Sequence, residues 1–251
     1  MNVNTLQKKI RIRDVVSAEL TKIISHPVAI AALALTIIIN LAFAIIDAIG
    51  VSFYVNSNQP PATISSFGVV MFFPIYVFLI LPVIAASSEY KEGQFRMTLT
   101  ATPNRQRLII GKLIAMVMAV LSAIVVALIP PRLIIGMTDG LSFGFLIVDL
   151  GRWIAVYLLM SIIAFGLAGF LRSMITPLAI LIMIPIFVAT GVLLHWPEIL
   201  RFLPDQASMS LLGTPAYEVT ELPVAMALLT LICWALLWTL AYWITVIRRD
   251  S

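Results

Sequence analysis

Six long apolar runs divide the chain. They cover residues 27–49, 67–86, 108–129, 153–171, 175–194 and 224–247. Each is close to the ~20 residues that an α-helix needs to cross a bilayer, and lipid leaves a spanning backbone no partners outside its own helix. Residues 141–148 form a further run that is too short to span and contains Gly144, so we expect an interfacial loop there. The pattern predicts an all-α polytopic membrane protein with six transmembrane helices in a single domain, residues 1–251.

The composition agrees with this class. Hydrophobic residues make up 61% of the chain and charged residues 11%, whereas soluble domains have about half and about a quarter. A soluble globular domain is therefore excluded, and the low polarity also excludes a disordered chain. Cys233 is the single cysteine, so the chain can form no internal disulfide.

The basic residues predict the orientation. Lys and Arg accumulate in the cytoplasmic segments of membrane proteins. All of the 16 Lys and Arg residues except Arg132, Arg152 and Arg201 fall in the N-terminal segment, in the connections after the second and fourth runs, at the start of the third run (Lys112), or at the C-terminus. Six spans put both termini on one side, so we expect both in the cytoplasm and the chain in the plasma membrane.

The N-terminal segment predicts an amphipathic elbow helix, residues 8–25, that lies in the inner interface. Ile12, Val15 and Ile23 share one face, and Lys22 lies on the polar face. Glu19 falls within the apolar stripe, where a carboxylate needs a cationic partner. Two interpretations remain open: Glu19 pairs with a cation from elsewhere in the chain, or it bends towards the lipid headgroups.

The connection after the second run alternates charged and apolar residues. It predicts a surface helix on the cytoplasmic side, residues 88–102, which ends at Pro103-Asn104 before Arg105 leads back into the membrane. The alternative is a simple connecting loop with positive-inside charges. A simple loop, however, need not be so long or so mixed in charge.

These segments resemble the permease subunits of type 2 ABC exporters. The matching residues are Glu19-Leu20-Thr21-Lys22, Glu89, Glu92-Gly93, Leu99, Thr102-Pro103, Arg105, Gly111-Lys112 and Leu203-Pro204-Asp205. The resemblance implies a six-span permease with an elbow helix and a cytoplasmic coupling helix. It also implies that a pair of permeases, identical or homologous, forms the substrate pathway.

The resemblance further implies that a separate cytoplasmic ATPase subunit binds ATP and Mg and docks on the coupling helix. The residues expected at that contact are Glu89, Tyr90, Lys91, Glu92, Gly93, Phe95, Arg96, Leu99 and Arg172, with Glu19 and Lys22 on the elbow helix. Gly111-Lys112 looks like the end of a phosphate-binding loop, but Gln106 and Leu113 do not fit the motif. We therefore expect no ATPase activity, cofactor or metal in this chain, and membrane lipid rather than nucleic acid as a further partner.

Polar and aromatic residues within the runs are candidates for the pathway. Asn40 either faces the pathway or makes an interhelical hydrogen bond, and we favour the hydrogen bond. Phe72, Phe73 and Tyr76 either line an apolar route or face lipid and packed neighbours. A route of this kind suits an amphipathic or hydrophobic cargo such as a drug, an antimicrobial peptide or a lipid.

Prolines and charges suggest further local features. Pro74 and Pro82 are expected to break the second span, and Pro177 and Pro185 the fifth. Asp149 and Arg152 are three apart, a spacing that permits a helical ion pair. Residues 196–222 predict a re-entrant segment, as in the resembling family, or an ordinary interfacial loop.

Two other classes of function compete with the permease. Gly140-Leu141-Ser142-Phe143-Gly144 fits the nucleophile motif of hydrolases, but the pattern predicts no strand before it. His26 and His195 are the two histidines and are predicted on opposite sides of the membrane. An intramembrane hydrolase is therefore disfavoured. A passive channel or secondary carrier would transport without ATP, and the chain shows no inverted repeat of the kind many carriers have.

Overall fold

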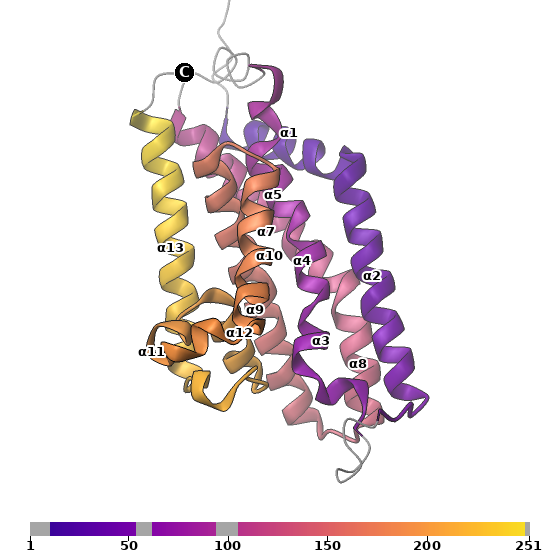
Figure 1. The fold of residues 1–251 in the computed structure, drawn as a ribbon. Helices are drawn as coiled ribbons and strands as arrows, with labels where there is room; N and C mark the ends of the chain where they lie inside the picture. Colours follow the sequence, from indigo (N-terminus) through magenta and orange to yellow (C-terminus); the bar gives the residue numbers. More distant parts are fainter. Residues whose placement is uncertain (1–10, 54–61, 94–104, 249–251) are drawn as a thin grey trace, which may run out of the picture.

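The computed structural model describes residues 11–53, 62–93 and 105–248. These residues form helices without a named strand, and an isolated bridge pairs Phe53 with Ala62. Figure 1 shows the long helices running side by side. Five helical stretches are long and apolar enough to cross a membrane: Pro27–Ala48, Gly68–Tyr90, Arg105–Thr138, Phe143–Leu171 and Val224–Arg248. The predicted class, an all-α polytopic membrane protein, is confirmed for the described residues.

The predicted fifth span is shorter than expected. It forms α10, Ile175–Ala189, with 15 residues, or about 22 Å of helix against a hydrocarbon core of about 30 Å. The helix ends because Gly191 adopts a left-handed conformation at φ 76°. α10 also continues through Pro185, so the break expected there is not observed.

The second span consists of three segments, α3 (Gly68–Phe72), α4 (Pro74–Phe78) and α5 (Ile80–Ser87). Pro74 has no N–H for the carbonyl of Val70, which instead accepts from the N–H of Phe73 at 3.1 Å. Pro82 likewise disrupts the turn that precedes it, and the second break falls at Leu79. Both expected breaks are confirmed.

The third and fourth spans are longer than predicted. α7 (Arg105–Ala127) is followed by α8 (Ile129–Thr138). α9 is one continuous helix, Phe143–Leu171. The expected interfacial loop at residues 141–148 is therefore wrong: a helix tolerates Gly144 at a cost of only about 1 kcal/mol, and no proline interrupts it.

Short elements close the two ends of the bundle. α1 (Ile12–Ser25) lies across one end (Figure 1) and packs against α7, α2 (Pro27–Ala48) and α5. At the other end, after η3 (Val192–His195) and α11 (Pro197–Leu200), every residue of α12 (Pro204–Leu212) is buried, with α9 and α13 (Val224–Arg248) as neighbours. This burial favours the re-entrant interpretation. We call these the α1 end and the α12 end.

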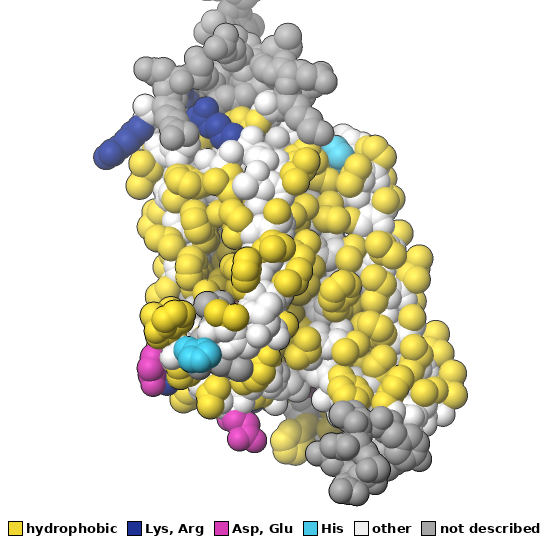
Figure 2. Space-filling view, viewed as in Figure 1, with side chains coloured by type: hydrophobic (Ala, Val, Ile, Leu, Met, Phe, Trp, Pro, Cys, Tyr) yellow, Lys and Arg dark blue, Asp and Glu magenta, His cyan; other side chains and the backbone are white. Residues whose placement is uncertain are grey.

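The face seen in Figure 2 is largely apolar along the helices. Lys and Arg side chains appear near the α1 end, and acidic side chains appear near the α12 end. Inside the bundle, α9 packs tightly on α13 because Gly166 and Gly169 leave room for Trp238 and Tyr242. Small residues of this kind are typical of helix contacts in membranes.

Candidate functional site

Four charged side chains meet at the α1 end, and we call them the charge cluster: Glu19 and Lys22 of α1, Glu89 of η2 (Ser88–Gly93) and Lys112 of α7. Lys112 Nζ lies 2.8 Å from Glu19 Oε2 and 3.1 Å from Glu89 Oε2. Lys22 Nζ lies 2.7 Å from Glu19 Oε1 and also contacts Glu89 Oε1. Each lysine thus bridges both carboxylates.

Three of the four side chains of the charge cluster are almost completely buried. The side chain of Lys112 is 2% exposed and those of Glu19 and Glu89 are each 5% exposed, whereas that of Lys22 is 46% exposed. A buried charge is tolerated only when it is paired, and here two positive charges balance two negative ones. Glu19 therefore has the cationic partner that one of the two sequence interpretations required.

The close approach of α1 to α7 depends on a glycine. A Cβ on Gly111 would lie 2.6 Å from Cγ1 of Val15, so a larger residue there would push α1 away. Val15 is itself buried on the apolar face of α1, one turn before Glu19. Gly111 thereby positions its neighbour Lys112 to reach the carboxylate of Glu19.

The cluster lies where the predicted coupling segment begins. η2 contains Glu89, Tyr90, Lys91, Glu92 and Gly93. Phe95, Arg96 and Leu99, together with the rest of the predicted helix 88–102, lie outside the described residues.

Arg172 reaches the same region from the end of α9. It adopts a left-handed conformation at φ 52°, which is uncommon for a residue other than glycine. Its guanidinium carbon lies 5.5 Å from the centre of the Tyr90 ring. The expected contact residues Tyr90 and Arg172 thus come together.

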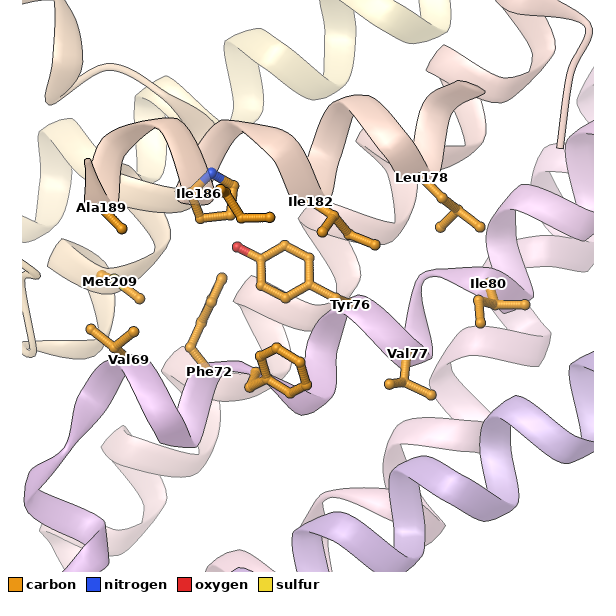
Figure 3. Close-up of a pocket in the computed structure, with 12 residues that line it drawn as sticks. Val69, Phe72, Tyr76, Val77, Ile80, Leu178, Ile182, Ile186, Ala189 and Met209 are labelled. Carbon is orange, nitrogen blue, oxygen red and sulfur yellow. The ribbon is translucent and has the colours of Figure 1, made fainter. Parts of the chain in front are cut away.

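An apolar cavity of about 360 Å³ lies between α3–α4 and α10 (Figure 3). It is lined by Val69, Phe72, Phe73, Tyr76, Val77, Ile80, Leu178, Ile182, Pro185, Ile186, Ala189 and Met209. Phe72 and Tyr76 are buried, with their ring centres 5.6 Å apart, whereas Phe73 is largely exposed. The three aromatic residues proposed for the pathway therefore share one cavity.

Asn40 does not line this cavity. Its Nδ2 donates to the carbonyl oxygen of Ala127 at 3.1 Å and lies 3.5 Å from the hydroxyl of Tyr157. Ala127 is four residues before Pro131, which has no N–H to donate to that carbonyl. Asn40 therefore replaces a missing helix hydrogen bond, which agrees with the interhelical interpretation.

The predicted ion pair between Asp149 and Arg152 is not formed. Asp149 instead lies 4.0 Å from Arg132, whose guanidinium stacks 3.5 Å from the centre of the Trp153 ring. Spacing along the sequence could not predict Arg132 as the partner of Asp149, because Arg132 lies on α8 and comes near α9 only when the two helices pack together.

The residues of the rival hydrolase motif are not arranged as a strand–turn–helix. Ser142 is exposed and precedes the first turn of α9, and α8 is the element before it. His195 Nδ1 lies 3.0 Å from the carbonyl oxygen of Val192. Among the described residues, no group of three or more His, Cys, Asp or Glu side chains could hold a metal ion.

Comparison with models of known protein families and with curated proteins gives no significant match. The fold and the site themselves define the class: a helical membrane protein with a buried charge cluster at one end and an apolar cavity between its helices.

Proposed function

We propose that the chain is the membrane permease subunit of an ATP-driven exporter. In this proposal the chain crosses the plasma membrane six times with both termini in the cytoplasm, and α10 together with the residues that follow it makes the fifth crossing. Two permeases form the pathway, and separate ATPase subunits bind ATP and Mg. The cargo is amphipathic or hydrophobic.

The observation that carries the proposal is the charge cluster. Three of its four ion pairs join α1, η2 and α7 to one another, and the fourth, Lys22–Glu19, lies within α1. A force applied to the segment after Glu89 would therefore act on three elements at once. This is the arrangement that a coupling segment needs in order to turn movement of a cytoplasmic partner into movement of the spans.

The breaks in the second span provide the flexibility that this coupling also requires. Because α3, α4 and α5 are separated at Phe73 and Leu79, the cavity side of this span can bend while its α5 end stays fixed to the cluster. Helices bend at prolines with little loss of hydrogen bonding. Movement at the cluster would then alter the cavity between α4 and α10.

The test is to purify the chain from its native membrane through a tag at Ser251. We expect a complex that contains permease and ATPase subunits in equal numbers and hydrolyses ATP, measured by mass spectrometry of the intact complex and by phosphate release with and without vanadate. A chain that purifies without a nucleotide-hydrolysing subunit, and conducts solutes in liposomes without ATP, would instead be a channel or carrier.

A further inference from the structure

Two buried polar atoms near the α12 end of the cavity have no hydrogen-bond partner among the described residues: the hydroxyl of Tyr76 and Oδ1 of Asp205. Tyr76 is 9% exposed and Asp205 is 2% exposed. Buried polar groups are nearly always hydrogen-bonded, and leaving one unpaired costs about 1–3 kcal/mol. Two such atoms near one cavity could form hydrogen bonds with the polar head of a bound ligand.

The hydroxyl of Tyr76 is directed into the cavity towards α10 (Figure 3) and is the one polar side-chain group in its lining. Asp205 does not line the cavity itself but lies one helical turn before the lining residue Met209 on α12. Its Oδ2 accepts a hydrogen bond from Gln206 at 2.9 Å, and its carboxylate acts electrostatically on Tyr76. The thioether side chain of Met209 is flexible, so it can move aside and open the way to Asp205.

The neighbouring elements supply no cation for this carboxylate. α3 carries no charged residue, and α13 carries its one charge, Arg248, at the opposite end. Arg152 of α9 lies near Gly213, at the far end of α12, and Asp149 of α9 pairs with Arg132. Asp205 is thus a buried acid in the first turn of α12, and these neighbouring elements place no cation beside it.

We propose that the cavity holds the apolar body of a cationic amphiphile whose ammonium group pairs with Asp205 beside the Tyr76 hydroxyl. An anionic head would be repelled by the carboxylate, and a neutral head would gain only hydrogen bonds. Burial raises the pKa of the Asp205 carboxyl, and an adjacent cation lowers that pKa. Cation binding is therefore favoured at pH values above the raised pKa, where the carboxylate is ionised, and releases protons at pH values close to it. The inference rests on the proposed function, for which it names the class of cargo.

The test compares two probes with the same tail, decylammonium and decanol, on the protein in phosphatidylcholine nanodiscs, with protein-free nanodiscs as the background. Binding is measured with radiolabelled probes at neutral pH. We expect the wild-type protein to bind decylammonium at least about tenfold more tightly than decanol, equivalent to about 1.4 kcal/mol. Asp205→Asn should remove this preference without changing decanol binding, and Tyr76→Phe should weaken it.

Glu198→Gln is the matched control, because this acid lies at the same end on α11 and already pairs with Arg201; it should keep the preference. The wild-type protein provides a second test that needs no variant: the preference should decrease as acid protonates Asp205, while decanol binding stays constant. Equal binding of both probes to the wild-type protein, or a preference kept in Asp205→Asn, would overturn the inference. The assay contains neither ATP nor ATPase, so its outcome is separate from that of the proposed function.

Discussion

Lys112 Nζ lies 2.8 Å from Glu19 Oε2, although the two residues are 93 positions apart in the chain. Both side chains are almost completely buried. A buried pair of this kind contributes little net stability compared with apolar residues, but removal of one partner strands the other charge. The pair therefore fixes α1 on α7 by making any other arrangement costly.

Replacement of Lys112 tests this relationship. Lys112→Met removes one of the two lysines that bridge Glu19 and Glu89, and it should lower the free energy of unfolding by about 3–5 kcal/mol. Lys22→Met is the matched control and should cost about 1 kcal/mol or less, because Lys22 is half exposed and exposed pairs contribute little. Unfolding in mixed micelles, followed by circular dichroism, measures both. Equal losses would show that the cluster is not a buried unit.

Asn40 and Pro131 form a second testable pair. Asn40→Leu should cost about 1 kcal/mol, because it leaves the carbonyl of Ala127 without a donor. In a Pro131→Ala background residue 131 regains its N–H, so the same substitution should cost less. A double-mutant cycle on unfolding free energies measures the coupling, and purely additive costs would mean that Asn40 does not compensate for the proline.

The raised pKa of Asp205 predicts a pH dependence of stability. Burial raises the pKa of this carboxyl, so the folded state keeps its proton at pH values where the unfolded chain, with a pKa of about 3.9, has lost it. Stability should therefore fall as pH rises from about 4 through the raised pKa. Asp205→Asn should be more stable than the wild type at neutral pH and should show a smaller loss. Thermal unfolding of both proteins from pH 4 to pH 8 gives the comparison.

The coupling segment gives a prediction that rests on the proposed function. Phe95 and Leu99 stand four apart in the sequence, as two anchors on one helical face would, and buried anchors carry most of the energy of an interface. Phe95→Ala should therefore weaken recruitment of the ATPase more than Lys91→Ala does, as measured by co-purification. A double Glu92→Lys, Phe95→Ala variant that recruits the ATPase and transports normally would make the segment a mere connector.

How far the sequence predicts the fold depends on the kind of signal. Apolar runs revealed the membrane class and the approximate position of every long helix, because length and hydropathy are local properties. The ends were less accurate. A loop was expected at residues 141–148, but α9 already begins at Phe143. α10 ends at Ala189 although the apolar run extends to Leu194.

The partners of the buried charges could not be predicted from the sequence, and the reason is physical. Helical periodicity placed Glu19 on an apolar face and so predicted that it needs a cation, but it could not single out Lys112, which only the packing of α1 on Gly111 brings near. The same limit explains Asp149, for which spacing suggested Arg152 although α8 supplies Arg132. Local rules predict that a partner is needed, and the tertiary fold decides which one it is.

The packing of α9 on α13 gives the last prediction. A Cβ on Gly166 would lie 2.5 Å from the backbone carbonyl carbon of Trp238, and a backbone atom cannot swing aside as a side chain can. Gly166→Ala should therefore force the two helices apart and lower the free energy of unfolding by about 1–3 kcal/mol. Gly151→Ala is the matched control on the same helix, because its Cβ would meet nothing within 4 Å. The control should keep or raise stability, since alanine favours a helix over glycine by about 1 kcal/mol. If both variants unfold at the same denaturant concentration, the close contact between α9 and α13 does not exist in the membrane protein.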